Sequence, residues 1–443
     1  MFFFFYNITS IFLVLPVSLY HWYRSVSRGR SPAFKERFGF LPREELAKIG
    51  GRPVIWLHAV SVGEAIAARP LLKALRAKYP CHAILVSNTT ETGRAITSSF
   101  PEKDISLYFP FDFLPAVRRA LEHIKPELII IMETEIWPNF TRQAALRGIP
   151  VILANGRISD RSYSRYLAFK WFFRHALQLF SNLCMQTEVD RERIIAIGAP
   201  PERTLRIGNL KYDIPFRHLS PEDIIALKEH YTIPHELSVI CAGSSHPGEE
   251  EHIISAYREL LVSRSDLFLV LVPRHPERAA NVAALLANAG LAYRRRTDLA
   301  ATSDVMFRSG EVLLVNTIGE LMGLYALSDV VFVGGSLVPT GGHNLLEPAS
   351  VGVPTIFGPH MTNFREIAAL VLQHQAGIQV DTPADLAEAF QKLLSEPVLR
   401  QELGRNGLLM MRENGGATER HMEIIAGYLD TKFPSNNTKQ RSN

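Results

Sequence analysis

Short apolar runs alternate with longer amphipathic segments along most of the chain after residue 53. The runs lie at residues 54–57, 83–86, 128–131, 151–153, 238–240, 268–271, 312–315, 330–333 and 355–357. Runs that are apolar at nearly every position predict strands buried on both faces, as in a parallel sheet. Segments 65–78 and 115–124 have helical spacing. This alternation predicts an α/β fold with right-handed crossovers and two doubly wound sheets, one in each half.

The first 23 residues are strongly apolar and contain no charged side chain. As a helix they would span roughly 34 Å, enough for a hydrocarbon core of about 30 Å. A basic leader and a small-residue cleavage site, which mark a secretory signal, are both missing. We therefore expect residues 1–23 to form a membrane anchor, with Tyr20, Trp22 and Tyr23 at the membrane interface.

Basic residues follow the anchor directly, at Arg24, Arg28, Arg30 and Lys35. By the positive-inside rule they hold the rest of the chain on the cytoplasmic side, against anionic lipids. Pro16 and the polar residues near position 9 interrupt the apolar segment. A helix lying in the membrane interface is therefore an open alternative to a spanning one.

A length of 443 residues suits two domains rather than one core. We expect an N-terminal Rossmann-like domain over 24–213 and a hinge over 214–234. A second Rossmann-like domain covers 235–416, followed by a helix over 417–430 and a disordered tail over 431–443. With 47% hydrophobic and 21% charged residues, the chain is neither disordered nor a coiled coil.

Charge and cysteine content remove several classes of function. A net charge of +4 is too small to indicate a nucleic-acid partner. Cys81, Cys184 and Cys241 are widely spaced and predict neither a disulfide framework nor a metal cage. The 15 histidines show no ligand spacing, and the chain has no DxD, HExxH or GxSxG motif. We therefore expect a reaction without metal or cofactor.

Two acidic motifs follow predicted strands of the first half. Ser61-Val62-Gly63-Glu64 opens a helix, and Glu64 there is either a general base for a hydroxyl nucleophile or only a capping residue. Glu133 and Glu135 lie in Glu133-Thr134-Glu135-Ile136-Trp137-Pro138-Asn139, where an extended segment would point both carboxylates the same way. Paired acids at a strand end are costly unless they are hydrogen-bonded or functional.

The second half carries motifs suited to an anionic ligand. Ser244, Ser245 and His246 follow its first strand, and Arg274 leaves the next strand after Pro273. Residues 334–349 form a glycine-rich loop that runs into a helix expected to begin near His343 and Asn344. Backbone amides of such a loop can hold a phosphate, and Glu347 can accept from ribose hydroxyls. Lys211, after the last strand of the first half, is a further candidate for an anion, and a solvated lysine is the alternative.

Together, these motifs resemble the 3-deoxy-D-manno-octulosonic acid (Kdo) transferase family. The resemblance covers nearly the whole chain and is carried by the sequences SVGE, ETEIWPN, GNLKYD, PRHPER and GGHNLLEP at 61–64, 133–139, 208–213, 273–278 and 341–348. It implies a GT-B glycosyltransferase fold, with a cleft between two Rossmann-like domains. It also implies inverting, metal-independent transfer of Kdo from CMP-Kdo to a lipid A precursor at the cytoplasmic face of the inner membrane.

The resemblance also assigns roles to individual residues. It implies that Glu64 is the general base and that one acid of the second motif is also required, with Glu135 favoured over Glu133. The residues implied to bind the nucleotide are Pro273, Arg274, Ile318, Gly319, Glu320, Asn344 and Glu347. Further donor or acceptor contacts are expected from Ser244, Ser245, His246, Lys211, Gly342 and His343.

Three other functions stay open on the sequence alone. The chain could be a membrane-associated GT-B transferase that uses a UDP-sugar, which a comparison of CMP with UDP binding would decide. A sugar-nucleotide epimerase would have no use for a lipid acceptor or an anchor. A non-catalytic scaffold would not be expected to retain Glu64, Arg274 and Glu347 together.

Overall fold

The computed structural model describes residues 2–27, 31–214, 219–299 and 305–430. The chain forms two compact units. Unit 1 consists of residues 1–213 and 414–443, and unit 2 consists of residues 214–413. The tail expected over 431–443, and the basic residues Arg28 and Arg30, lie outside the described residues.

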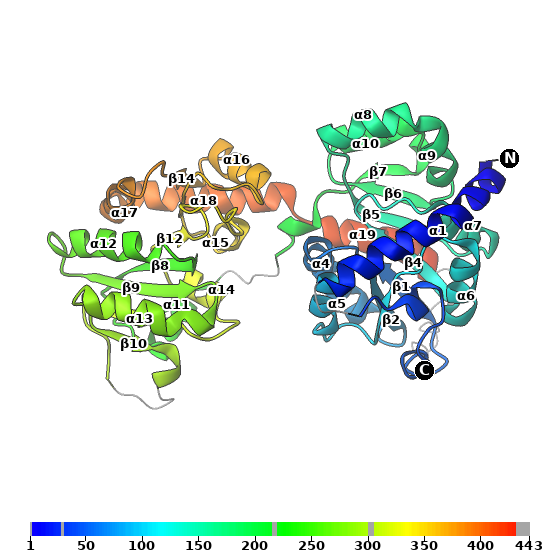
Figure 1. Cartoon of the computed structure of the whole chain (residues 1–443). Helices are drawn as coiled ribbons and strands as arrows, with labels where there is room; N and C mark the ends of the chain where they lie inside the picture. The colour runs from blue at the N-terminus through cyan, green and yellow to red at the C-terminus, as the bar shows by residue number, and fades with distance from the viewer. Residues whose placement is uncertain (1, 28–30, 215–218, 300–304, 431–443) are drawn as a thin grey trace, which may run out of the picture. The chain divides into compact units, whose positions relative to one another are not determined.

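Unit 1 is built on a seven-stranded sheet in the order β3-β2-β1-β4-β5-β6-β7 (Figure 1). Each of its strand pairs is parallel. The strands are β1 Val54–His58, β2 Ala83–Asn88, β3 Ile105–Tyr108, β4 Pro126–Met132, β5 Val151–Gly156, β6 Asn182–Met185 and β7 Thr204–Arg206.

Helices cover both faces of this sheet. They are α1 Phe2–Val26, α2 Phe34–Arg37, α3 Arg43–Ala47, α4 Val62–Lys78, α5 Glu91–Ser98, α6 Leu114–Ile124, α7 Pro138–Leu146, α8 Asp160–Ala168, α9 Lys170–Leu177, α10 Glu188–Ile197 and α19 Ala417–Leu429. Two cores result from the alternation of side chains along each strand. Trp56 packs with residues of α6 and α7 on one face, whereas Ile55 and Leu57 pack with residues of α4 and α19 on the other.

Unit 2 repeats this architecture, with the strand order β10-β11-β9-β8-β12-β13-β14 and parallel pairing. Its strands are β8 Ser238–Ser245, β9 Leu267–Pro273, β10 Tyr293–Arg295, β11 Val312–Leu314, β12 Val330–Val333, β13 Thr355–Phe357 and β14 Gly377–Gln379. Its helices are α11 Pro221–His230, α12 Glu250–Leu261, α13 Ala279–Asn288, α14 Leu321–Ala326, α15 Leu346–Ser350, α16 Arg365–Gln373, α17 Asp385–Ser395 and α18 Pro397–Asn414.

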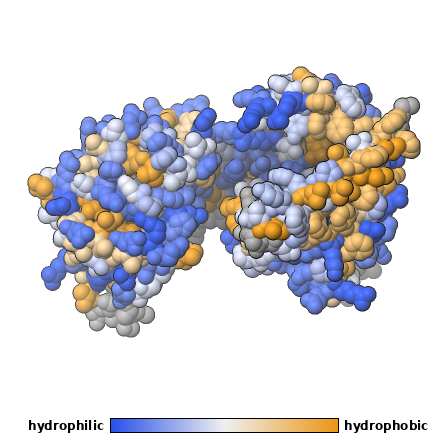
Figure 2. Space-filling model, viewed as in Figure 1, coloured by the Kyte–Doolittle hydropathy of each residue, from blue (hydrophilic) through white to orange (hydrophobic). Residues whose placement is uncertain are grey.

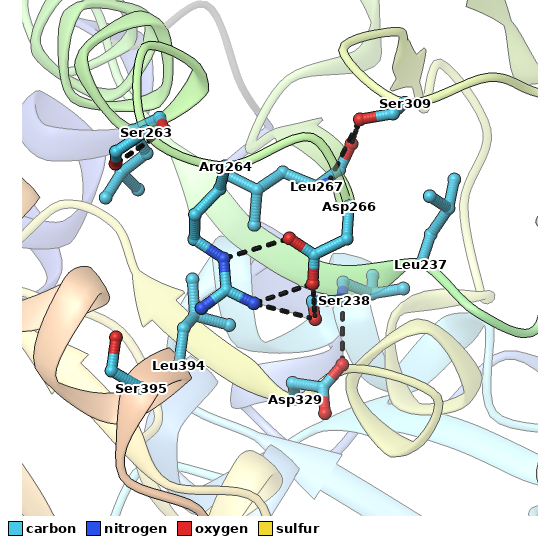
Figure 3. A network of polar contacts seen from close by, with 12 residues as sticks. Leu237, Ser238, Ser263, Arg264, Asp266, Leu267, Ser309, Asp329, Leu394 and Ser395 are labelled. Atoms are coloured by element: carbon cyan, nitrogen blue, oxygen red, sulfur yellow. Dashed lines mark hydrogen bonds and ion pairs between the residues drawn. The ribbon is translucent and has the colours of Figure 1, made fainter.

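The amino ends of β8 and β9 carry a compact polar network (Figure 3). The guanidinium of Arg264 donates to Asp266 through Nε at 3.0 Å and Nη2 at 2.6 Å. The Ser238 hydroxyl donates to the same carboxylate at 2.9 Å, and the Val239 amide donates to Asp329 at 2.9 Å. This edge therefore satisfies its own polar groups, while the motif-bearing loops leave from the opposite, carboxyl edge of the sheet.

The nine apolar runs identified in the sequence all form strands, which confirms the two parallel α/β sheets. Five further strands were not expected, namely β3, β6, β7, β10 and β14. All five have three or four residues and lie at or next to a sheet edge, and β10 and β14 have no fully buried position. Short edge strands leave little periodic signal because they need less apolar surface. The segment expected as a hinge contains α11, and the last helix, α19, belongs to unit 1.

Helix α1 is long and apolar enough to cross a membrane over Phe2–Tyr23, by length and composition. In the structure it lies along unit 1, and Figure 2 shows the band of apolar residues that it presents on the surface. The hydroxyl of Tyr6 donates to Asp112 at 2.7 Å. The Ser25 hydroxyl donates to Glu91 at 2.8 Å, and the His21 ring packs against Phe111 with centroids 5.3 Å apart. Contacts with unit 1 therefore occur near both ends of the helix.

Candidate active site

Glu64 lies at the start of α4, directly after β1 and its following loop. Ser61 is the N-cap in extended conformation, so the chain turns sharply and places Glu64 in the first helical turn. The carboxylate accepts from the Val60 amide at 2.8 Å and from the Ser61 hydroxyl at 3.0 Å. Glu64 as a whole is only 8% exposed to solvent. Burial raises the pKa of Glu64 to about 7, and the nearby Glu133 carboxylate adds to the rise.

The second acidic motif follows β4 and does not continue as an extended segment. Glu133 has a φ of +54°, so the chain turns at this residue. The expectation of an extended segment that points both carboxylates the same way was therefore wrong. Burial raises the pKa of Glu133, whereas Lys211 and Arg157 act against this rise. Burial, helped by Glu64 and Glu133, raises the pKa of Glu135 to about 8.

These three carboxylates therefore form one electrostatically coupled group at the carboxyl edge of the unit 1 sheet. Burial disfavours the charged form of both Glu64 and Glu135, so their pKa values are raised toward and above neutrality as members of one coupled group. Glu133 is the member with compensating cations nearby. A group poised near neutrality in this way is suited to proton transfer.

Lys211 is held near Glu133 by a short helical turn, Leu210–Tyr212. The Asn209 side chain caps this turn by accepting from the Lys211 amide at 3.0 Å. Asn155 in β5 accepts from the Leu210 amide at 3.0 Å. The ammonium therefore belongs to the surroundings of the carboxylates in its own unit, and its expected contact with an anionic substrate is still a prediction.

In unit 2, the loop after β8 and the glycine-rich loop after β12 lie together. Nε2 of His246 and Nε2 of His343 are 2.9 Å apart, and the two rings are stacked with centroids 5.1 Å apart. Burial, followed by Arg274, lowers the pKa of His343 to about 4. Burial also lowers the pKa of His246. Two neutral imidazoles so close can share one hydrogen bond only if a single proton lies between them.

Arg274 leaves β9 directly after the buried Pro273, and its own residue is exposed. The charge of Arg274 acts to lower the pKa of both His343 and Glu347, so Arg274 lies in the same cluster as these two residues. The Asn344 side chain donates through Nδ2 to the Glu347 carboxylate at 3.4 Å, and burial raises the pKa of Glu347. An exposed guanidinium beside neutral imidazoles and an amide is suited to an anionic, hydroxyl-bearing ligand.

The glycine-rich loop differs from the expected phosphate cradle in two respects. The helix after it, α15, begins at Leu346 rather than near Asn344. The amides of Gly335, Ser336 and Leu337 all donate to the Glu249 carboxylate, so they are not free to bind a phosphate.

Glycines in this region permit close packing. A Cβ on Gly334 would lie 2.5 Å from the Ser244 carbonyl oxygen, and one on Gly342, which has a φ of +76°, would lie 2.3 Å from Met361 Sδ. Ser244 itself adopts a φ of +58°, and the Ser245 hydroxyl donates to Glu250 at 3.0 Å. Both serines therefore belong to the end of β8, where the register shifts, and do not follow the strand as expected; the Ser245 hydroxyl is already engaged within the protein.

The loop 318–320 has a separate network. Ile318 is 88% exposed, and Gly319 has a φ of +99°. The Glu320 carboxylate accepts from Arg296 Nε at 2.7 Å and from the Tyr231 hydroxyl at 2.8 Å. The Glu320 side chain therefore holds this loop in place, while the nucleotide contact expected of the loop is still a prediction.

Sequence reasoning gave no role to Glu249, which is the first of three consecutive glutamates at 249–251. The sequence signal was weak because acidic residues are also common at the start of a solvent-exposed helix. In the part of the chain that the structure describes, no group of three or more His, Cys, Asp or Glu residues could hold a metal ion.

Comparison with known proteins identifies the family of this chain. Residues 32–214 match the family model described as 3-deoxy-D-manno-octulosonic-acid transferase (kdotransferase). A 3-deoxy-D-manno-octulosonic acid transferase from Haemophilus influenzae is 36% identical over 407 residues, which is 90% of this chain and 93% of that protein. The corresponding enzyme from Bordetella pertussis is 32% identical over 85% of this chain and 87% of its own length.

A solved structure supports the fold alone. The crystal structure of a UDP-N-acetylglucosamine 2-epimerase homologue from Listeria monocytogenes has a TM-score of 0.52 at 13% identity. It covers 87% of this chain and 98% of its own. Two parallel-sheet units of this kind form the GT-B fold, which transferases and epimerases share, so chemistry has to be read from the site. The identity to curated relatives over nearly the full length decides the family: this chain belongs to the 3-deoxy-D-manno-octulosonic acid transferases, a family of glycosyltransferases.

Proposed function

We propose that this protein transfers Kdo from CMP-Kdo to a hydroxyl group of the lipid A precursor, lipid IVA, with inversion at the anomeric carbon and without a metal ion. The observation that carries the proposal is the buried Glu64 carboxylate, whose pKa of about 7 lets it accept a proton at neutral pH. Family membership supports the sugar, and the sequence resemblance supports the donor, the acceptor and the stereochemistry.

In the proposed reaction, Glu64 accepts the proton of the acceptor hydroxyl as its oxygen attacks the anomeric carbon of Kdo. The new carbon–oxygen bond forms as the bond to the CMP phosphate breaks, and CMP leaves with the electron pair. A single displacement of this kind inverts the anomeric centre. Glu135 is the second carboxyl in the proposal, and in its protonated form it can donate a hydrogen bond to a substrate oxygen.

The donor is assigned to unit 2, where Arg274 meets the negative charge of the departing nucleotide. Asn344, Glu347 and the segment 318–320 complete the proposed nucleotide contacts. We expect Arg274→Ala to weaken CMP binding by roughly 10- to 100-fold, the value of a charge-assisted hydrogen bond. Isothermal titration calorimetry measures the affinity for CMP, and the same titration with UDP provides the comparison. Tighter binding of UDP than of CMP would favour a UDP-sugar transferase instead.

The main test is incubation of the purified full chain with CMP-Kdo and tetraacylated lipid A precursor, followed by mass spectrometry. We expect the mass of the precursor to increase by one or more Kdo units. The addition should persist in the presence of a chelator, because the proposal assigns no metal. Hydrolysis of CMP-Kdo without modification of the lipid would contradict it.

The proposed location is the cytoplasmic face of the inner membrane, with α1 as the single anchor. The apolar side chains on the outer face of α1, including Phe12 at 75% and Tyr23 at 69% exposure, would enter the lipid. A helix that crossed the bilayer could not keep the Tyr6–Asp112 and Ser25–Glu91 hydrogen bonds at the same time. These contacts favour a helix lying in the membrane interface over a spanning one.

Fluorescent tags test this arrangement. We expect a tag at the N-terminus and a tag at the C-terminus both to fluoresce in the cytoplasm, because an in-plane helix leaves both ends on one side. Opposite locations of the two tags would show that α1 spans the membrane. Periplasmic location of the C-terminal tag would contradict the proposed orientation altogether.

A further inference from the structure

The most fully bonded carboxylate described in unit 2 belongs to Glu249, a residue to which no role has been assigned. Glu249 lies at the N-terminus of α12 and is 0% exposed. Its Oε2 accepts from the Gly335 amide at 2.6 Å and from the His246 amide at 2.9 Å. Its Oε1 accepts from the Ser336 and Leu337 amides, both at 2.9 Å. Four backbone donors therefore converge on one buried carboxyl group.

The four amides come from two different loops. His246 lies in the loop after β8, whereas Gly335, Ser336 and Leu337 lie in the glycine-rich loop after β12. Successive amides that point toward one centre form an anion-binding nest. In this protein the nest is filled by a side chain, so the carboxylate joins the two loops where a bound anion would otherwise do so.

The contact continues through Gly335 to the far end of the glycine-rich loop. The carbonyl of Gly335 accepts from the Gly342 amide at 2.7 Å and from the Thr340 hydroxyl at 2.9 Å. Gly342 directly precedes His343, whose Nε2 lies 2.9 Å from that of His246. The Glu249 carboxylate thus holds the His246 backbone directly and the His343 backbone through two hydrogen-bonded steps.

We propose that Glu249 is a positioning residue for the donor: it fixes the distance between the two loops and thereby places His246, His343 and Asn344. This inference rests on the proposed assignment of the donor to unit 2. The pattern of donors requires a carboxylate. Glutamine has one oxygen and one NH2 group, and the NH2 group would face two N–H donors in either orientation. An aspartate is one methylene too short to serve both loops from the same backbone position.

The test compares Glu249→Gln with Glu251→Gln in the full chain. Glu251 lies two residues further along α12 and is exposed, so it controls for the loss of one charge at the same helix end. We expect Glu249→Gln to raise the KM for CMP-Kdo by about 10- to 100-fold and to leave the KM for the acceptor lipid within about twofold. Glu251→Gln should match the wild type in both.

The split between the two KM values separates positioning from general instability, because partial unfolding lowers the active fraction and kcat without changing the donor KM selectively. A wild-type donor KM in folded Glu249→Gln would overturn the inference. If wild-type protein transfers no Kdo from CMP-Kdo, the proposed function itself fails, which is a different result.

A milder variant keeps the inference testable if Glu249→Gln does not fold. Thr340→Val removes the hydroxyl that donates to Gly335 on the exposed side of the loop while keeping the shape of the side chain. We expect it to raise the donor KM by roughly two- to tenfold, again without an effect on the acceptor KM. An unchanged donor KM in folded Thr340→Val, with Glu249→Gln unfolded, would reduce Glu249 to a structural residue and overturn the inference.

Discussion

Buried carboxylates at the carboxyl edges of the two sheets differ in the number of hydrogen-bond donors that face them. In unit 1, Glu64 accepts from one amide and one hydroxyl, and its pKa is raised to about 7. In unit 2, Glu249 accepts from four amides, and Glu250 accepts from Arg278 and the Ser245 hydroxyl. Both unit 2 residues are completely buried.

The difference shows how the same residue type serves two purposes. A buried carboxylate that faces several hydrogen-bond donors can join separate chain segments, as Glu249 and Glu250 do. A buried carboxylate with few donors and with acidic neighbours is driven toward its neutral form, and can exchange a proton near pH 7. Acid–base chemistry is therefore assigned to unit 1, and loop placement to unit 2.

The largest expected effect comes from removing the proton acceptor of unit 1. Glu64→Ala should lower the rate of transfer by roughly 10²- to 10⁴-fold, because a general base contributes about this factor. CMP binding should be unchanged, since the nucleotide is assigned to unit 2. Glu44→Ala, which removes an exposed carboxylate of α3, is the matched control. Wild-type turnover in Glu64→Ala would contradict the assignment of acid–base chemistry to the unit 1 sheet.

Removing a partner of a unit 2 carboxylate should act on stability instead. Arg278→Met leaves the Glu250 carboxylate buried with one hydroxyl donor, and we expect the free energy of unfolding to fall by about 3 kcal/mol. Urea unfolding of the full chain followed by circular dichroism measures this. The double variant Glu250→Gln with Arg278→Met should recover part of the loss, because no charge then stays unpaired. A double variant less stable than Arg278→Met would contradict the explanation.

An intermediate effect is expected on the pH dependence of transfer. In the proposed mechanism the charged form of Glu64 is the base, so the rate should rise with pH through about 7 and fall as the carboxylate is protonated below it. Glu133 helps to raise the pKa of Glu64 and of Glu135. Glu133→Gln should therefore shift the midpoint of the rate profile to lower pH, by up to about one unit. A shift to higher pH would show that Glu133 does not act through its charge.

The smallest effect is expected at the amino edge of unit 2. Asp266→Asn disturbs the partly exposed Arg264–Asp266 pair shown in Figure 3, and such pairs contribute about 0.2–1 kcal/mol to stability. Transfer should be unchanged, because ligands bind at the carboxyl edges of such sheets. The measurements are urea unfolding and the donor KM. A change in donor KM comparable to that of Glu249→Gln would contradict the assignment of the donor site to the carboxyl edge of the unit 2 sheet.

Much of the fold could be predicted from the sequence because parallel strands leave an unmistakable pattern. Strand β4, buried at six of its seven positions, was recognised from a run of isoleucines and leucine. β14, with three residues and no fully buried position, was not, because so short an edge strand carries little apolar pattern of its own. In the site, Glu64 was found because a helix start after a strand is a local signal.

Other features of the site depend on contacts between distant residues. Glu249 and the amides of Gly335 to Leu337 are more than 80 positions apart, and only the pairing of β8 with β12 brings them together. The turn at Glu133 likewise replaced an expected extended segment.

The sequence by itself determined the two parallel sheets, the apolar N-terminal helix and the acidic and glycine-rich loops, since each is encoded in neighbouring residues. Only the tertiary structure decided which carboxylates have pKa values raised toward neutrality and which are enclosed by hydrogen-bond donors. A carboxylate's state depends on its burial and on the donors around it, and those donors come from segments that the chain brings together only on folding.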